Sequence, residues 1–206
     1  MDELRPGLFR WTAPHPDWEP EAEAESPADW PQLVGSVAYD ARETAVLIDP
    51  LVGDGGWDEL DAFVRGRPVH VLTTIGFHSR SRDAVEARYG AAAESGSDAL
   101  LPGVVAIPIP DAGETMFWLP EHRALVPGDR LLGDGEGGLR LCPPSWLRYL
   151  RNDMTIDRLR EELRPLLDLP VELVLVSHGE PVLADGSTAI ARALDDQLHH
   201  SSATER

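Results

Sequence analysis

The sequence predicts an α/β protein, and three observations lead to this fold class. Short apolar runs rich in β-branched residues alternate along the chain with segments whose apolar residues recur at helical spacing. The most strand-like run, Val171–Val176, is too short for a helix. It stops at Ser177-His178-Gly179, and a helix-like segment follows. Because ligand crevices in open α/β folds lie at the carboxyl ends of strands, His178 is a candidate site residue.

Four strands are expected in the N-terminal half of the chain. They cover Leu4–Thr12, Leu33–Tyr39, Ala45–Ile48 and Val69–Thr73. The first alternates apolar with polar residues and contains aromatic side chains, which is typical of a half-buried strand. The second and third look like a pair that is joined by the turn Asp40–Glu43.

Helices are expected where apolar residues recur every three or four positions. The clearest is Thr155–Leu167, because Ile156, Leu159 and Leu163 share one face. The other expected helices are Trp57–Arg65, Ser81–Tyr89 and Ser187–Leu198.

Three further strands are expected over Leu101–Pro110, Glu114–Leu119 and Arg123–Val126. His122 then lies in the turn between the last two and is expected to be exposed. The segment Gly133–Gly138 has neither the lysine nor the following helix of a phosphate-binding loop, so it is interpreted as a turn.

Length and composition favour one domain over residues 1–206, since 206 residues with 42% hydrophobic content can bury a substantial core. Residues 19–29 are expected to form a solvated acidic loop, and residues 199–206 a flexible tail. No apolar run is long enough for a membrane span and no signal-peptide pattern is present, so a cytoplasmic location is expected. His15, which lies between two prolines, is interpreted as a surface histidine in a loop.

The charge balance narrows the classes of partner. A formal net charge of −18 argues against nucleic acid and anionic membranes, because both require a basic face. All 18 basic residues are arginine, which excludes lysine Schiff-base chemistry and the lysine of a P-loop. The single cysteine, Cys142, excludes an internal disulfide. A small molecule remains the expected class of ligand.

Four of the apolar runs end on, or lead into, a potential metal ligand or acid–base group. Any one of these groups alone fits a turn residue or a helix cap. Together they predict that the side chains meet in one pocket at the edge of a sheet. The four residues are Asp49, His78, Asp129 and His178.

The order of these elements and three motifs resemble the metallo-β-lactamase superfamily over roughly residues 35–194. The motifs are Leu47-Ile-Asp-Pro50, Leu119–Asp129 and Val176–Pro181. The resemblance implies a four-layer αββα sandwich, in which two mixed sheets pack face to face with helices outside. It also implies a metal site at one edge of that sandwich.

The chain departs from the superfamily at its main metal-binding motif, His-x-His-x-Asp-His. Here the sequence reads His78-Ser-Arg-Ser-Arg-Asp83, so that Arg80 and Arg82 stand where a histidine and an aspartate belong. The resemblance therefore implies a reduced ligand set, with the first histidine, the bridging aspartate and the last histidine as His78, Asp129 and His178.

Two functions remain open at this point. In the first, the reduced set holds at most one zinc or iron ion, which activates water to hydrolyse an ester, thioester or amide; no catalytic side chain is assigned. In the second, the pocket holds no metal and binds a small anionic ligand through Arg80 and Arg82, because guanidinium groups suit planar anions. Further candidates for contact with a ligand or a metal are Asp83, Asp49 and Glu114.

Overall fold

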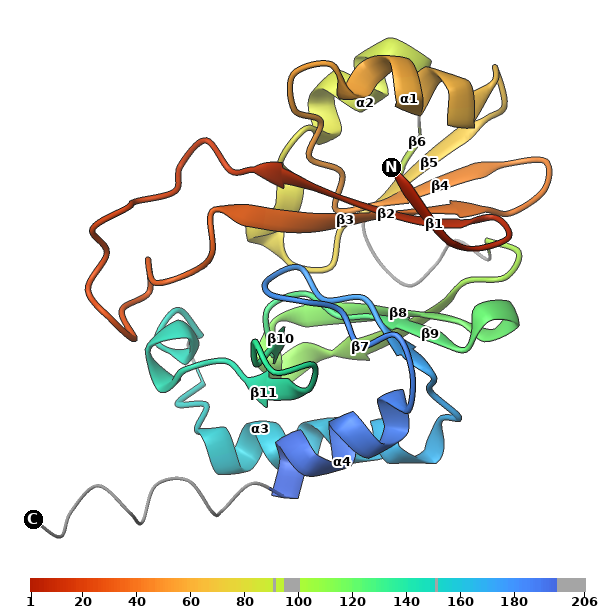
Figure 1. Cartoon of the computed structure of the whole chain (residues 1–206). Coiled ribbons are helices and arrows are strands. Elements are labelled where there is room, and N and C mark those ends of the chain that lie inside the picture. Colours follow the sequence, from red (N-terminus) through yellow and green to blue (C-terminus); the bar gives the residue numbers. More distant parts are fainter. Residues whose placement is uncertain (91, 95–100, 151, 196–206) are drawn as a thin grey trace, which may run out of the picture.

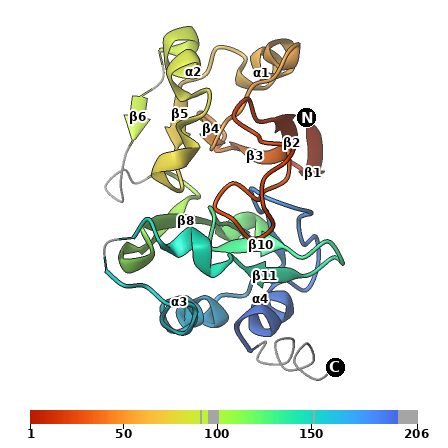
Figure 2. The ribbon, with the colours of Figure 1, turned by 90° about the vertical axis from the view of Figure 1, so that its left-hand side faces the viewer.

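The computed structural model describes residues 1–90, 92–94, 101–150 and 152–195. Two β-sheets pack face to face, and helices cover the outer side of each sheet (Figure 1). A view from the side shows the four layers in succession (Figure 2). The predicted αββα sandwich is therefore confirmed. Within the described residues the α-helices are α1 (Gly56–Val64), α2 (Arg82–Tyr89), α3 (Ile156–Leu163) and α4 (Gly186–Asp195).

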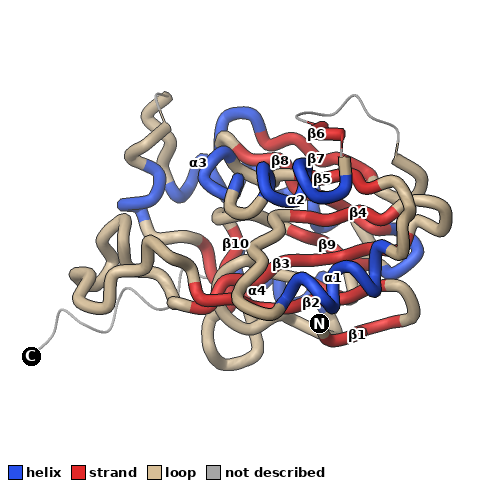
Figure 3. The backbone as a smooth tube through the Cα atoms, turned by 90° about the horizontal axis from the view of Figure 1, so that it is seen from above, coloured by secondary structure: helices blue, strands red, loops and turns tan. Residues whose placement is uncertain are grey.

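The first sheet has the strand order β1-β2-β3-β4-β5-β6. Strands β1 to β4 pair antiparallel, whereas β4, β5 and β6 pair parallel. Parallel neighbours need crossover connections, and α1 and α2 supply them over the outer face of this sheet (Figure 3). The strands are β1 (Asp2–Arg5), β2 (Leu8–Pro14), β3 (Leu33–Asp40), β4 (Ala45–Ile48), β5 (Val69–Leu72) and β6 (Ala92–Glu94).

The second sheet has the order β12-β9-β8-β7, and α3 and α4 lie on its outer side. A separate hairpin, β10-β11, lies at its border. The strands are β7 (Val105–Ile109), β8 (Glu114–Leu119), β9 (Ala124–Val126), β10 (Leu131–Gly133), β11 (Leu139–Leu141) and β12 (Leu173–Val174).

Apolar side chains fill each interface between layers. Ile48 and Leu119 belong to the group packed between the two sheets, and both are fully buried. Leu60 attaches α1 to the first sheet, and Leu159 and Ile190 attach α3 and α4 to the second. Each such side chain contributes roughly 1.5–3 kcal/mol through burial, so the layers are held mainly by the hydrophobic effect.

Two predicted elements are interrupted. The strand expected over Leu4–Thr12 is divided into β1 and β2, because Gly7 turns the chain with a φ of 82°. The helix expected over Thr155–Leu167 changes to a 3-10 helix, Arg164–Asp168, at its end. Pro165 lacks the N–H that an α-helix needs at this position and therefore ends the regular hydrogen bonding.

The strand expected over Val171–Val176 pairs with β9 only at Leu173–Val174. Beyond this pair the chain crosses to β3, where the Gly35 N–H donates a hydrogen bond to Ser177 O (2.7 Å). A Cβ on Gly35 would lie 2.7 Å from the carbonyl oxygen of residue 176, so only glycine permits this approach. The crossing carries His178 to the border between the two sheets.

Strands β6, β10 and β11 were not predicted from the sequence. The last two form a hairpin around Gly133–Gly138, which confirms the turn that was expected there. Helix α4 agrees with the helix expected over Ser187–Leu198 as far as Asp195. The rest of that helix and the expected tail, 199–206, lie outside the described residues.

The expectation that His122 is exposed is wrong. His122 ends a short 3-10 turn and is buried, and its ring packs edge-to-face on Tyr39 with 5.4 Å between ring centroids. The turn between β8 and β9 is thus folded back against the first sheet.

Residues 19–29, the expected acidic loop, contain turns and neither helix nor strand. Within the described ranges of the chain, no helix is both long and apolar enough to cross a membrane.

Candidate metal centre

A cavity of about 250 Å³ opens at the edge of the sandwich, where loops of both sheets meet. Four large aromatic side chains, Trp30, Phe77, Trp146 and Tyr149, line it together with polar and charged groups. The floor contains His78, Asp129 and His178, and Arg80 lies beside them. The structure thus brings three of the predicted strand-end residues together, while the fourth, Asp49, lies behind His78.

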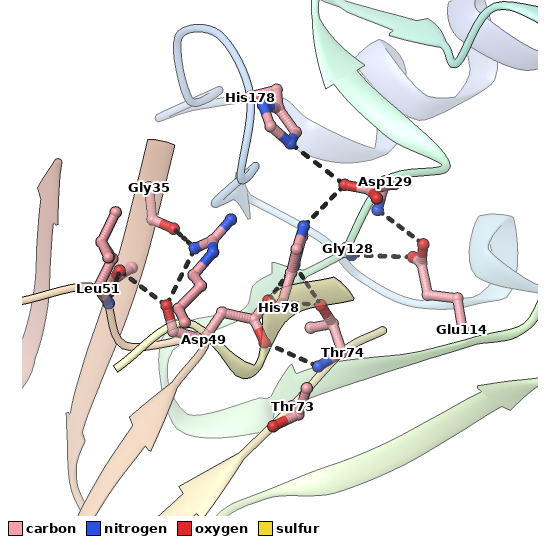
Figure 4. A network of polar contacts seen from close by, with 12 residues as sticks. Gly35, Asp49, Leu51, Thr73, Thr74, His78, Glu114, Gly128, Asp129 and His178 are labelled. Carbon is pink, nitrogen blue, oxygen red and sulfur yellow. Dashed lines mark hydrogen bonds and ion pairs between the residues drawn. The ribbon is translucent and has the colours of Figure 1, made fainter. Parts of the chain in front are cut away.

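His78 lies between two carboxylates (Figure 4). The residue belongs to a 3-10 turn, Gly76–Ser79, that follows β5. Its Nδ1 is 2.8 Å from Asp49 Oδ2, and its Nε2 is 2.9 Å from Asp129 Oδ1. Because Asp49 occupies Nδ1, the orientation of the ring is fixed with Nε2 toward the cavity floor.

Asp49 directly follows β4, and its hydrogen bonds explain why it supports the site rather than lining the cavity. The Thr74 N–H donates to Asp49 Oδ1 (2.8 Å), and the Thr74 hydroxyl donates to Oδ2. The Ser36 hydroxyl donates to the Asp49 carbonyl oxygen (2.8 Å). Every oxygen of Asp49 therefore has a partner, and its carboxylate is a fixed anchor for His78.

Asp129 follows β9, and Glu114 holds its backbone in place. Both carboxylate oxygens of Glu114 accept hydrogen bonds from consecutive backbone N–H groups, those of Gly128 (2.9 Å), Asp129 (2.8 Å) and Arg130 (3.0 Å). Burial raises the pKa of Glu114 to about 7. Glu114 is not among the residues that line the cavity, so it positions Asp129 instead of facing a ligand.

His178 completes the floor from the second sheet. Its Nε2 lies 3.3 Å from Asp129 Oδ1. The ring is flanked edge-on by Trp30 and Trp146, with 5.7 and 5.5 Å between ring centroids. The Gly133 N–H donates to the His178 carbonyl oxygen (2.9 Å), so that the β10-β11 hairpin supports the loop from behind.

The charges of the floor follow from its burial and its pairing. Burial opposes the protonated form of His78, but Asp129 and Asp49 outweigh it and raise the pKa of His78 to about 9. Burial likewise opposes the carboxylate of Asp129, yet His78 and His178 hold the pKa of Asp129 well below its ordinary value. Burial lowers the pKa of His178. Without a metal, the floor is therefore an imidazolium–carboxylate pair beside a neutral histidine.

The donor set fits one metal ion. One ligand atom each from His78, Asp129 and His178 lies within 4.8 Å of the other two. Asp129 Oδ1 is buried and receives no hydrogen bond of normal geometry, although two ring nitrogens are close to it. The three ligand atoms are therefore close enough to one another to bind a single ion together. Two imidazole nitrogens and one carboxylate oxygen match zinc, and also non-haem iron.

Arg80 lies at the side of this group with an unusual backbone, φ 42° and ψ −118°. Its Nη1 donates to the carbonyl oxygens of Gly35 (2.7 Å) and Asp49 (3.0 Å). Its Nε and Nη2 are buried and have no hydrogen-bond partner. Burial lowers the pKa of Arg80. One of the three guanidinium nitrogens thus has hydrogen-bond acceptors and the other two have none. The group adds positive charge next to the cavity floor.

The structure places Arg82 and Asp83 outside the cavity. Both belong to the first turn of α2, where Arg82 Nε donates to Glu86 Oε1 (2.7 Å) and Asp83 is exposed. The positive φ of Arg80 turns the chain before the helix begins, so Arg82 and Arg80 point to different surroundings. The sequence had suggested that the two arginines share one pocket, and the structure shows that they do not.

Five aromatic or imidazole side chains that line the cavity were not among the predicted site residues: His15, Trp30, Phe77, Trp146 and Tyr149. Trp30 and Trp146 line the cavity on either side of His178. His15 was expected at the surface but is half-buried, lines the cavity and packs edge-to-face on Trp30 at 5.0 Å. Its place between two prolines, which favour extended backbone, is a signal that the sequence offers for His15.

No family model and no curated protein matches the sequence. Solved structures do match it. VMB-1 is similar with a TM-score of 0.63 and 14% sequence identity, over 94% of this chain and 93% of that chain. A metallo-beta-lactamase family protein from Thermus thermophilus has a TM-score of 0.56 and 17% identity, over 92% and 78% of the two chains. The metallo-beta-lactamase FIM-1 from Pseudomonas aeruginosa, in its mono-zinc form, has a TM-score of 0.56 and 11% identity, over 92% of each chain.

Identities at this level show a common fold and not a common activity. They agree with the architecture of two packed sheets and outer helices. The chain has the fold of the metallo-β-lactamase superfamily.

Proposed function

We propose that this protein is a metal-dependent hydrolase that uses one divalent ion, held by His78, Asp129 and His178. The convergence of their three ligand atoms at the cavity floor carries the proposal. The mono-zinc form of FIM-1 supports it, because that structure shares the fold. The bound ion would supply a water of lowered pKa for the hydrolysis of an ester, thioester or amide.

The chain's own residues account for the other requirements of such a site. Asp49 fixes the ring of His78, and Glu114 fixes the backbone of Asp129. Trp30 and Trp146 shield His178 from bulk water. A metal ligand needs this kind of support, because outer partners set both the orientation and the basicity of the atoms that bind the ion.

The metal content of the purified protein tests the proposal. The protein is prepared without chelators, loaded with zinc and measured by elemental analysis after desalting. We expect about one ion per chain, because protein sites of this type bind tightly. Asp129→Asn and His178→Ala should each lose the ion. Less than about a tenth of an ion per chain after loading would contradict the proposal.

Asp83→Asn is the matched control. Asp83 is a carboxylate from the same sequence motif, but it is exposed on α2 and lies away from the cavity. This variant should keep the ion and the activity toward simple esters. An equal loss of metal in this variant and in Asp129→Asn would mean that the ion binds at unspecific surface carboxylates.

A second candidate function has one observation in its favour, namely the two buried nitrogens of Arg80 that lack a partner. In this case the pocket holds no metal, and Arg80 turns toward the cavity to bind a small carboxylate or phosphate. The imidazolium of His78 would then take the place of the metal charge beside Asp129.

Thermal shift with acetate and inorganic phosphate tests this second function. Either anion should raise the melting temperature of the parent protein and of Arg82→Ala, because Arg82 is bound to Glu86 outside the cavity. Arg80→Ala should show no shift. Arg80→Lys serves as a second variant that keeps the charge if the alanine variant fails to fold. An unchanged melting temperature of the parent protein with both anions rejects this function.

A further inference from the structure

The mouth of the cavity is formed by two exposed aromatic rings from different layers. Phe77 belongs to the 3-10 turn after β5, and Tyr149 follows the 3-10 helix Pro144–Leu147 of the second half. Phe77 is 65% exposed and Tyr149 is 62% exposed. Their rings nevertheless touch edge-to-face at 5.6 Å, and both line the cavity. Large exposed apolar side chains at a cavity mouth are typical of a surface that a ligand covers.

Two further aromatic side chains line the cavity. Trp30 and Trp146 line the cavity next to His178. The Trp146 N–H donates to the carbonyl oxygen of Ser26 (3.2 Å), so its polar atom is already used within the protein. The cavity therefore presents ring carbons to a ligand at its mouth and beside His178.

Two arginines line the cavity, but each already donates to backbone carbonyl oxygens, and the exposed charges near the mouth are acidic. Arg80 donates to two backbone carbonyls, and its other nitrogens are buried beneath the surface. Arg130 is buried and donates to the Ala112 carbonyl oxygen (2.9 Å). At the mouth, exposed Asp17 lines the cavity, and the segment behind it has four exposed glutamates: Glu19, Glu21, Glu23 and Glu25. An anion would approach against this negative field, whereas an uncharged molecule is unaffected.

We propose that the substrate has an uncharged aromatic or branched apolar group, which binds between the Phe77–Tyr149 pair and the two tryptophans. This inference rests on the proposed function, because it treats the cavity as the place where the substrate is held. A volume of about 250 Å³ suits one phenyl-sized group beside the bond to be cleaved. Aromatic rings at such a wall favour an apolar partner through burial and edge-to-face contact.

Binding of three matched small molecules tests the inference directly. Phenylacetamide is neutral and aromatic, acetamide is neutral and lacks the ring, and phenylacetate has the ring and a negative charge. Titrations by NMR or calorimetry should give at least about tenfold tighter binding for phenylacetamide than for the other two, given the area of a buried ring. Equal or tighter binding of acetamide or phenylacetate overturns the inference, as does the absence of binding by all three.

Two variants locate the binding at the mouth. Phe77→Ala and Tyr149→Ala should each weaken the binding of phenylacetamide by about tenfold, because a stacked aromatic contact and its buried area are lost. Leu183→Ala is the control, since Leu183 is 51% exposed but does not line the cavity. This control should bind as the parent protein does. Unchanged binding in both mouth variants overturns the inference.

The same samples separate this inference from the proposed function. Metal content and ester hydrolysis are measured beside binding. A protein that takes up no metal but prefers phenylacetamide disproves the hydrolase and retains the apolar site. A protein that binds one ion and hydrolyses methyl phenylacetate and methyl acetate at equal rates, with no preference in binding, retains the hydrolase and disproves the apolar site.

Discussion

His78 is the residue on which both candidate functions depend. Each of its ring nitrogens lies within 3 Å of a carboxylate oxygen, that of Asp49 at 2.8 Å and that of Asp129 at 2.9 Å. In the absence of metal the raised pKa of His78 keeps its ring protonated at neutral pH, and this single positive charge offsets part of the negative charge of the two buried carboxylates. A metal ion must displace the proton on Nε2, so metal binding and protonation of His78 compete.

The metal-free protein should lose stability as the pH rises from about 6.5 to above about 9. The pKa of His78 is raised in the folded protein to about 9 from an ordinary value of 6.5. The folded state therefore binds the proton more tightly than the unfolded state, and this stabilisation is complete below pH 6.5 and disappears as the pH passes 9. Burial also raises the pKa of Glu114, from 4.5 to about 7. The folded protein therefore loses further stability as the pH rises through this lower range.

Urea unfolding in the presence of a chelator, at several pH values across this window, measures the effect. We expect a decrease on the order of a few kcal/mol in the free energy of unfolding. His78→Gln should remove most of the slope between about pH 7 and about pH 9, because it has no proton to lose in this range. A stability that is flat or rises across the window in the parent protein contradicts the assigned charge of His78.

At the residue scale, the sequence predicted some of the residues that the structure brings together in the candidate site. Asp129 and His178 were recognised because each follows an apolar run, and the ends of buried strands meet at one edge of the sandwich. Arg82 was wrongly expected beside Arg80 in the cavity. The path of the chain between them depends on the positive φ of Arg80, which the residue types do not reveal. The positioning role of Glu114 was also missed, since it depends on three backbone N–H groups of a loop that is distant in sequence.

At the scale of elements, the β10-β11 hairpin holds the loop that contains His178. Gly133 ends β10 and lies directly against Gly179 and Glu180. A Cβ on Gly133 would be 2.5 Å from Glu180 O and 2.6 Å from Glu180 N. Both contacts involve backbone atoms, so the loop would have to move.

Gly133→Ala should therefore destabilise the protein by about 1–3 kcal/mol and reduce its metal content, because it displaces His178. Urea unfolding and elemental analysis measure the two effects. Gly76→Ala is the control, since a Cβ there meets nothing within 4 Å and its φ is not positive. A parent-like stability and metal content in Gly133→Ala would show that the hairpin does not hold the loop.

The elements themselves were predicted to different degrees. Helix α3 was clear in the sequence because its apolar face repeats, and Thr155 caps it by accepting a hydrogen bond from the Arg158 N–H (3.2 Å). Strands of three residues, such as β10 and β11, are too short to show a period of two. The early end of β12 depends on Gly35 in a different sheet, which is a tertiary effect.

At the scale of the whole molecule, charge repulsion opposes folding. The formal net charge is −18 at pH 7, and the acidic residues outnumber the basic ones by two to one, 36 against 18. Several ion pairs at the surface offset part of this, among them Arg5–Glu172 and Arg88–Asp61. Such exposed pairs contribute little each, so a net repulsion remains.

Sodium chloride should therefore raise the melting temperature. At about 0.5 M salt the screening length is shorter than the spacing of most surface charges, so repulsion is weakened more than the few close pairs are. Differential scanning calorimetry from low to high salt measures the change in melting temperature. Sucrose, which is uncharged, is the control for solute effects that do not depend on charge screening. A melting temperature that decreases with salt would mean that the ion pairs outweigh the repulsion.

The floor of the cavity draws its ligand atoms from both halves of the sandwich. His78 follows β5 of the first sheet, whereas Asp129 follows β9 and His178 follows β12 of the second. An ion bound to all three would fasten one half to the other, and the halves could not separate without releasing it. Unfolding would then require dissociation of the ion, which would tie the lifetime of the folded protein to the supply of metal.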